Sequence, residues 1–358
     1  MFLAGTGLPE RWRGRDRFAI CELGFGTGIN VLAAWRAWNS CRNPHAVLHI
    51  STIEAFPLAR EDAERALAAF PELSDLAAKL LARWPVRAAG PQRLWFPEDG
   101  FALTLHVGQA EEVLEGMVGA FDAWFLDGFS PARNPGMWSA QALGRIGALS
   151  AQAARAGTFT VAGSVRRGLQ AAGFALDKKP GFAHKRERLE ARFAGAGTVP
   201  ALSSPYPYAA AHPRRVAILG AGVAGAACAH ALARRGVETI VLEAAAARGA
   251  GASGNPAGLV MPRLDREGPL SELFLAAYLD AISTYEALGA LEACGVVQRP
   301  ERARQAALAD LIADPPLPAD WFTARGDGAA FHARAGLVRP QPAIAVMLRQ
   351  AKLMLESP

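Results

Sequence analysis

The segment ILGAGVAG at residues 218–225 constrains the fold of this chain more than any other feature. Gly220, Gly222 and Gly225 have GxGxxG spacing, directly after the apolar run VAIL and directly before a helix-forming segment. In a βαβ unit such glycines permit a tight turn, the approach of a pyrophosphate to the backbone, and close packing of helix on strand. Glu243 ends the next predicted strand, where an acid accepts hydrogen bonds from a ribose 2′-hydroxyl. The sequence therefore predicts a dinucleotide-binding unit that begins near residue 214.

The acid at position 243 disfavours NADP, because a carboxylate would repel the extra phosphate. The continuation RGAGASGNPAGLVMPRL (248–264) favours FAD over NAD. This segment resembles the Gly-Ala-Ser-rich segment of the amine-oxidising flavoproteins of the D-amino-acid oxidase and glycine oxidase class. The resemblance implies that Ser253 and Gly254 lie against the FAD. The alternative is a flexible loop that holds no ligand.

A second glycine-rich turn, ELGFGTG, occupies residues 22–28 and follows the short apolar run 18–23. Its GxGxG spacing resembles the first motif of S-adenosylmethionine-dependent methyltransferases, whose cofactor has no pyrophosphate. The resemblance implies a site for S-adenosylmethionine, with Glu54 holding the ribose hydroxyls from the end of the next predicted strand. A generic nucleotide-binding Rossmann unit is the alternative. The residues assigned to this site in the turn are Glu22, Gly24, Gly26 and Gly28.

Two further positions fit a methyltransferase site. Gln109 stands where many of these enzymes place an aspartate near the adenine amine, and an amide can also form that hydrogen bond. Asp127, in FLDGFSPARNPGMW (125–138), ends a predicted strand where residues that face the methyl acceptor are found. A primary alkylamine has a pKa of about 10, and its ammonium form has no lone pair. A carboxylate that orients the amine and takes its proton would allow transfer, so Asp127 is the catalytic candidate; the alternative is a turn-capping aspartate.

A basic segment, KKPGFAHKRERLEAR, is predicted to form two strands around a Lys-Lys-Pro-Gly turn. Along an edge hairpin its cations would face nucleic-acid phosphates. The alternative is a solvated strand edge that charge protects against aggregation. The formal net charge of +5 permits a nucleic-acid partner without requiring one. The cations in question are Lys178, Lys179, Lys185, Arg186 and Arg188.

The order of predicted elements indicates an α/β protein with two nucleotide-binding units. Strands at 18–23, 46–54, 101–108, 121–129 and 157–163 alternate with helical segments, which is typical of a mostly parallel doubly wound sheet with a hairpin at one edge. Small residues and prolines dominate 194–213, so we predict domains at 1–193 and 214–358 joined by this linker. No apolar run approaches the roughly 18–20 residues of a membrane span. The four cysteines form no CxxC pair, which predicts free thiols, no metal and a cytoplasmic location.

Together these motifs identify a family. The start ELGFGTG, the turn LDGFSPARNPGMW, the strand GFAHKRERL, the linker and the fingerprint ending GASGNPAG resemble the bifunctional tRNA 5-methylaminomethyl-2-thiouridine biosynthesis family over nearly the whole chain. The resemblance implies FAD-dependent conversion of 5-carboxymethylaminomethyl to 5-aminomethyl (2-thio)uridine at the tRNA wobble position. It further implies S-adenosylmethionine-dependent N-methylation to the 5-methylaminomethyl group. The basic hairpin would then bind tRNA.

Both ends of the chain are expected to fall short of this family. The segment that normally precedes FLAGTGLPERW is missing, and the chain stops at KLMLESP, which we predict to lie in a helix after GLVRPQPAIAVML. We therefore expect an incomplete flavin domain. Two alternative functions stay open: a methyltransferase for another amine beside a non-functional flavin domain, and a non-catalytic tRNA-binding remnant.

Overall fold

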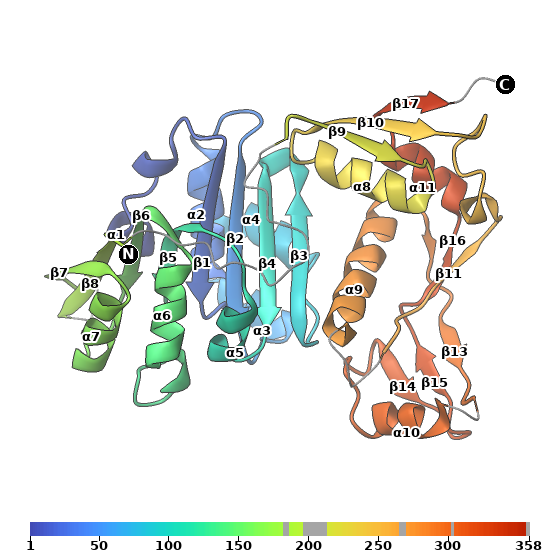
Figure 1. Cartoon of the computed structure of the whole chain (residues 1–358). Coiled ribbons are helices and arrows are strands. Elements are labelled where there is room, and N and C mark those ends of the chain that lie inside the picture. The colour runs from blue at the N-terminus through green and yellow to red at the C-terminus, as the bar shows by residue number, and fades with distance from the viewer. Residues whose placement is uncertain (182–185, 196–212, 265–269, 302–303, 356–358) are drawn as a thin grey trace. The chain divides into compact units, whose positions relative to one another are not determined.

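The computed structural model describes residues 1–181, 186–195, 213–264, 270–301 and 304–355 (Figure 1). The chain divides into two compact units, Met1–Ala209 and Ala210–Pro358. Most of the predicted linker, residues 196–212, lies outside the described residues. The predicted boundaries at 193 and 214 therefore stay predictions.

The first unit is built on an eight-stranded sheet with the order β3-β4-β2-β1-β5-β6-β8-β7. The five central strands run parallel, while β3 at one edge and the β7–β8 hairpin at the other are antiparallel to their neighbours. This confirms the predicted α/β class with a doubly wound sheet and an edge hairpin. The strands are β1 (Arg17–Leu23), β2 (Val47–Glu54), β3 (Gly90–Phe96), β4 (Phe101–Val107), β5 (Phe121–Leu126), β6 (Ser150–Thr158), β7 (Phe174–Pro180) and β8 (Glu187–Phe193).

Helices cover both faces of this sheet, because the central strands are apolar on both sides. On β1, Ile20 packs into a core with α2 and α4, whereas its neighbour Cys21 packs into a second core with α5, α6 and α7. Packing against these two cores determines the position of each strand, and so which residues lie at the carboxyl edge of the sheet. The helices are α1 (Phe2–Gly5), α2 (Ile29–Asn39), α3 (Arg60–Leu67), α4 (Ser74–Leu81), α5 (Ala110–Gly116), α6 (Ala140–Ala148) and α7 (Gly163–Ala171).

Three details of the first unit differ from the sequence-based prediction. Strand β3 was not predicted at all. Strand β6 covers Ser150–Thr158, so the strand predicted over 157–163 begins too far along the chain. The segment SAQAARA was not recognised as a strand because its side chains are small and show no alternation of apolar residues. Strand β7 continues through Pro180, so Lys178 and Lys179 lie in the strand and not in a turn. The Gly181 N–H donates to the carbonyl oxygen of Arg186 at 3.0 Å.

The second unit begins with a three-stranded parallel sheet of order β17-β10-β9. Helices α8 and α11 pack side by side against one face of it, and their Ala226 and Ile344 meet Val241 of β10 (Figure 1). The prediction of a helix at KLMLESP was wrong for residues 352–355, which pair with β10 after α11 has ended at Met347; residues 356–358 lie outside the described residues. The elements are β9 (Arg215–Leu219), α8 (Val223–Ala233), β10 (Glu238–Glu243), α11 (Pro340–Met347) and β17 (Lys352–Leu355).

The rest of the second unit, as far as the structure describes it, contains short antiparallel strands and the α-helices α9 and α10. One sheet has the order β11-β16-β12 and the other β13-β15-β14. The elements are β11 (Gly258–Val260), α9 (Ser271–Ala287), β12 (Leu291–Glu292), β13 (Val296–Gln298), α10 (Gln305–Ala313), β14 (Phe322–Ala324), β15 (Ala330–His332) and β16 (Gly336–Val338).

Candidate cofactor sites and active site

The glycine turn after β1 is held close to the end of β5. Gly24, Gly26 and Gly28 have φ values of +92°, +51° and +77°, which side chains with a Cβ rarely adopt. A Cβ on Gly24 would overlap the carbonyl oxygen of Asp127. The turn therefore depends on glycine at position 24 for both its conformation and its packing.

Glu54 lies against the same turn. Its carboxylate accepts a hydrogen bond from the Gly26 N–H at 3.1 Å and one from the Phe56 N–H at 3.0 Å. The structure thus brings the end of β2 to the glycine turn. That Glu54 holds the ribose of S-adenosylmethionine stays a prediction.

Glu22 lies beneath the turn, and its side chain is engaged on both oxygens. Oε1 accepts from the Asn30 Nδ2 at 2.9 Å, and Oε2 accepts from the Thr52 hydroxyl at 3.0 Å. The residue is only 1% exposed. The buried Glu22 side chain therefore binds neighbouring residues of the protein. This favours a role in positioning the turn over direct contact with S-adenosylmethionine.

Asn30 is a residue of the site that the sequence did not single out. The same Nδ2 that binds Glu22 also donates to Asp127 Oδ2 at 2.8 Å. One amide on the first turn of α2 therefore joins two acids. The only sequence signal was a polar residue at the start of the otherwise apolar INVLAAW.

Burial changes the acidity of both carboxyl groups. Burial raises the pKa of Glu22 to about 8, although the hydrogen bonds from Asn30 and Thr52 oppose the rise. Burial also raises the pKa of Asp127, and the hydrogen bond from Asn30 opposes it. Because Glu22 is mostly protonated at neutral pH, it places little negative charge beside Asp127. Asp127 is the less buried carboxyl group of this pair and stays the predicted proton acceptor.

Replacing Asn30 by alanine is expected to move the acid limb of the methyl-transfer pH profile to higher pH. Loss of the donor removes the hydrogen bond that lowers the pKa of Asp127, so the carboxylate ionises later. Rates measured from pH 5 to 9 test this, with Asn39→Ala as the control. Asn39 ends the same helix and binds Asp99 at 2.9 Å, away from the turn. An unshifted profile for Asn30→Ala would contradict this role.

Replacing Glu22 by glutamine is expected to flatten the dependence of stability on pH. The pKa of Glu22 rises from 4.5 to about 8 on folding. Between these values the unfolded chain has released the proton and the folded chain has not, so this group lowers the free energy of unfolding as pH rises. The loss is on the order of a few kcal/mol by pH 8. Urea unfolding at pH 5 and pH 8 measures this change in the free energy of unfolding. Equal changes in the wild type and in Glu22→Gln would refute the prediction.

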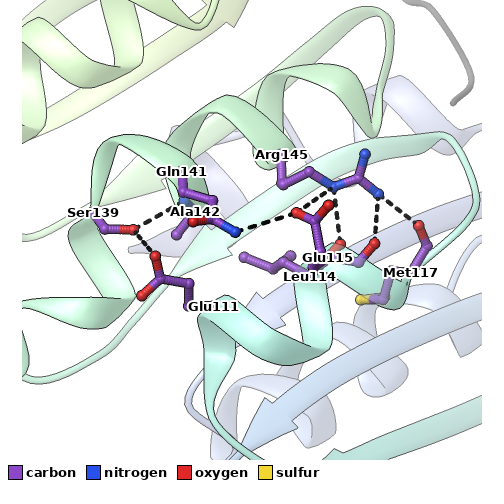
Figure 2. A network of polar contacts seen from close by, with 8 residues as sticks. All are labelled: Glu111, Leu114, Glu115, Met117, Ser139, Gln141, Ala142 and Arg145. Atoms are coloured by element: carbon purple, nitrogen blue, oxygen red, sulfur yellow. Dashed lines mark hydrogen bonds and ion pairs between the residues drawn. The ribbon is translucent and has the colours of Figure 1, made fainter.

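Gln109 lies just before α5, where α5 meets α6. It lines a pocket of about 550 Å³ together with residues of both helices and the turn that precedes α6. Ser139 caps α6 by accepting from the Ala142 N–H at 3.0 Å, and it donates to Glu111 on α5 at 2.9 Å (Figure 2). The first turns of the two helices are thus tied together beside Gln109.

The other ends of α5 and α6 are tied by Arg145. Its guanidinium donates to the carbonyl oxygens of Leu114 at 3.1 Å, Glu115 at 3.2 Å and Met117 at 2.9 Å (Figure 2). These carbonyls lie in the last turn of α5 and at its C-cap, where helix carbonyls lack the usual i+4 donor, and the arginine adds donors to them. Contacts at both ends fix α5 against α6 and hold Gln109 in place. That Gln109 binds adenine stays a prediction.

The turn after Asp127 folds back on itself. Trp138 is buried and donates its Nε1–H to the carbonyl oxygen of Phe129 at 2.8 Å. Met137 packs directly against Gly128, where a Cβ would overlap its sulfur. These two contacts hold the turn that follows Asp127 at the carboxyl edge of the sheet.

The predicted phosphate-binding cations of the hairpin have acidic neighbours. Lys178 pairs with Glu187 at 3.2 Å, Lys179 with Asp177 at 2.6 Å and Arg188 with Glu190 at 2.6 Å. Arg186 is exposed and forms no ion pair with a described residue, and Lys185 lies outside the described residues. The pairing reduces the positive field of the hairpin, which weakens the prediction that it binds phosphates.

The second glycine fingerprint has the geometry of a dinucleotide turn. Gly220 has φ of +95°, and a Cβ on Gly225 would overlap the Gly220 carbonyl oxygen, so helix α8 packs closely on the turn. Glu243 ends β10 and accepts from the Ala221 N–H at 2.7 Å. That hydrogen bond lowers the pKa of Glu243, which keeps it ionised and ready to accept from a ribose.

The Gly-Ala-Ser-rich segment meets the start of α8. Gly222 is the N-cap of this helix, and the Ser253 hydroxyl oxygen accepts from the Val223 N–H at 3.0 Å. A Cβ on Gly254 would lie 2.8 Å from the Gly249 carbonyl oxygen, so this bend is also tight. The structure therefore gathers the residues predicted for FAD at one helix N-terminus, where backbone N–H groups favour an anion.

The two parts of the chain match two protein families. The model of an S-adenosyl-L-methionine-dependent methyltransferase family matches residues 71–194, and that of an FAD dependent oxidoreductase family matches residues 215–354. The first match contains Gln109 and Asp127 but begins after the glycine turn. The chain therefore combines a methyltransferase domain that depends on S-adenosylmethionine with an oxidoreductase domain that depends on FAD.

Curated relatives contain both domains. Proteins of Maricaulis maris, Caulobacter sp. and Caulobacter vibrioides are 48%, 46% and 46% identical over 90%, 87% and 97% of this chain. Each is named tRNA 5-methylaminomethyl-2-thiouridine biosynthesis bifunctional protein MnmC. Over most of its length the chain is similar to these proteins. It covers 54%, 51% and 56% of these relatives, about half of their length.

Three further observations concern a solved structure, metal sites and membrane-spanning helices. Among solved structures, MNMC2 from Aquifex aeolicus aligns with 55% of this chain and 60% of its own, with a TM-score of 0.44 and 22% identity. The described residues contain no group of three or more His, Cys, Asp or Glu side chains that could hold a metal ion. Of the helices that the structure describes, none has the length and apolarity to cross a membrane.

Proposed function

We propose that this chain takes part in the two-step modification of the tRNA wobble uridine. FAD-dependent oxidation would convert 5-carboxymethylaminomethyl to 5-aminomethyl (2-thio)uridine, and methylation with S-adenosylmethionine would give the 5-methylaminomethyl product. The observation that carries the proposal is the position of Asp127, held by Asn30 beside the glycine turn of a methyltransferase domain.

In the methylation step S-adenosylmethionine supplies the methyl group. Glu54, Gln109 and the glycine turn would hold it. The amine must be neutral to attack, and its ordinary pKa of about 10 leaves most of it protonated. Asp127 would orient the amine and take one proton from its ammonium form; the freed lone pair then forms the N–C bond as the S–C bond breaks, which leaves the methylated amine protonated. The hydrogen bond from Asn30 to Oδ2 leaves Oδ1 available, because no described residue donates to it.

In the oxidation step FAD supplies the hydride acceptor. The carbon of the carboxymethyl group next to nitrogen would lose a hydride and the nitrogen a proton, and water would hydrolyse the resulting imine to the aminomethyl group and glyoxylate. The protein binds and orients the cofactor for this chemistry. Gly220, Gly222, Glu243 and Ser253 would hold FAD, since they lie around one helix N-terminus.

An absorbance spectrum of the purified chain tests the oxidation step. Flavin bands, together with conversion of tRNA carrying 5-carboxymethylaminomethyl-2-thiouridine to the aminomethyl form, are the expected results. A colourless protein that binds S-adenosylmethionine and methylates small amines would favour the alternative of another amine substrate. Salt-dependent tRNA binding without either cofactor would favour the remnant. We also propose a cytoplasmic location, because the proposed substrate is a tRNA.

A further inference from the structure

A second pocket lies beside Asp127. It lies on the β6 side of β5, whereas the glycine turn follows β1 on the other side of β5. It has a volume of about 360 Å³ and is lined by residues at the ends of β5 and β6 and at the start of β8. We propose that this pocket binds the amine-bearing pyrimidine base, and that exposed arginines around it bind the flanking phosphates. The inference rests on the proposed methylation function and adds the residues that recognise its acceptor.

The sheet order gives the pocket its place. Strand β5 lies between β1 and β6, so Asp127 at its tip has the cofactor turn on one side and the pocket on the other. Leu126 and Gly128, the two neighbours of Asp127, both line the pocket. The Asp127 side chain turns toward Asn30 and away from the pocket. Because Met137 fills the space beside Gly128, a 5-aminomethyl arm would reach Asp127 from the pocket once the Met137 side chain moves aside.

The lining of the pocket suits a nucleobase. Ligand pockets of 300–1,000 Å³ typically have apolar walls and a few polar groups that fix orientation. Here Leu126, Trp138 and Phe159 give apolar walls, while Ser130 and Thr160 add hydroxyls. The Thr160 hydroxyl oxygen accepts from the Ala162 N–H at 3.3 Å, which leaves its own proton free for a pyrimidine carbonyl.

One arginine lines the pocket, and two others follow lining residues closely in the chain. Arg186 lines it directly. The N–H of Arg133 donates to the carbonyl of pocket residue Ser130 at 2.8 Å, and the N–H of Arg166 donates to that of Ala162 at 3.0 Å. All three are exposed and form no ion pair with any described acid. Phosphate oxygens bind such guanidinium groups well.

This distribution of charge changes the expected site of tRNA contact. The hairpin cations Lys178, Lys179 and Arg188 are paired with carboxylates, whereas the arginines around the pocket are not. Glu187 lines the pocket but is already paired with Lys178. The pocket arginines are therefore freer than the hairpin to neutralise the phosphates beside a bound base.

Filling the pocket tests base binding. Ser130→Trp places an indole in the pocket, and Ala132→Trp is the matched control, since Ala132 is exposed in the same turn but does not line the pocket. Ser130→Trp is expected to raise KM at least about tenfold for both tRNA and free 5-aminomethyluridine, because a blocked pocket loses on the order of 1.4 kcal/mol or more of binding. S-adenosylmethionine affinity, measured by calorimetry, should be unchanged in both variants.

Neutralising the arginines tests phosphate binding. Arg133→Gln with Arg166→Gln is expected to weaken tRNA binding and to lower the salt slope by up to about 2, without changing methylation of the free nucleoside. Lys178→Gln with Lys179→Gln should change tRNA binding much less. The reverse order of effects would overturn the assignment of the phosphates to the pocket arginines.

The outcomes separate this inference from the proposed function. Equal KM values for Ser130→Trp and Ala132→Trp, with an active wild-type enzyme, would overturn the pocket and leave methylation intact. A wild-type chain that binds S-adenosylmethionine but methylates neither substrate would overturn the proposed function. In that case calorimetry with the nucleoside still decides the pocket: binding lost only in Ser130→Trp supports it, and equal binding in both variants refutes it.

Discussion

Replacing Asp127 by asparagine is expected to lower the rate of methyl transfer at least about 100-fold, because a general base contributes roughly 10²–10⁴. Asparagine can still accept the hydrogen bond from Asn30 but cannot take a proton from the amine. The affinity for S-adenosylmethionine should change by less than about threefold, since the glycine turn is untouched. Single-turnover methylation of tRNA carrying 5-aminomethyl-2-thiouridine, with calorimetry of the cofactor, measures both quantities.

The same variant decides between the catalytic and the structural interpretation of Asp127. Asparagine caps turns about as well as aspartate. If Asp127 only capped the turn after β5, Asp127→Asn would transfer methyl groups at nearly the wild-type rate. That result would remove the central residue of the proposed mechanism.

Replacing Gly24 by alanine is expected to abolish most cofactor binding and to destabilise the methyltransferase domain. The new Cβ would overlap the carbonyl oxygen of Asp127, and the residue would be held at φ of +92°. The left-handed conformation alone costs about 1–2 kcal/mol. The overlap adds about 1–3 kcal/mol. Calorimetry with S-adenosylmethionine, with circular dichroism during thermal unfolding, is the measurement.

Gly14→Ala is the matched control for this prediction. Gly14 has φ of +73°, but nothing lies within 4 Å of the position its Cβ would take. It therefore carries the conformational cost without the overlap and should leave cofactor affinity unchanged. Similar effects of the two substitutions would show that the approach of Gly24 to Asp127 is unimportant.

The parts of the sites that are local in sequence could be predicted. The glycine turns, together with Glu54 and Glu243 at the ends of the following strands, are set by the spacing of βαβ units, and the structure places them as that spacing requires. Asn30 could not be predicted, because its role depends on Asp127, which is 97 residues away in sequence. Only the finished sheet brings β1 and β5 side by side.

The errors in the fold have a similar cause. The tail KLML is too short to indicate its own structure, and it is a strand because β10 offers it a parallel edge. Strand β3 likewise depends on its antiparallel pairing with β4, and the Gln92 side chain fixes the segment before it by hydrogen bonds to Val86. The ion pairs of the hairpin also depend on strand register, which charge patterning alone did not reveal.

Methylation of a defined tRNA tests the central claim most directly. The purified chain would be incubated with S-adenosylmethionine and tRNA carrying 5-aminomethyl-2-thiouridine, and the wobble nucleoside would be analysed by mass spectrometry. We predict a gain of one methyl group on the amine, to give 5-methylaminomethyl-2-thiouridine. Saturable binding of S-adenosylmethionine with an unmodified wobble nucleoside would contradict the proposed methyltransferase function.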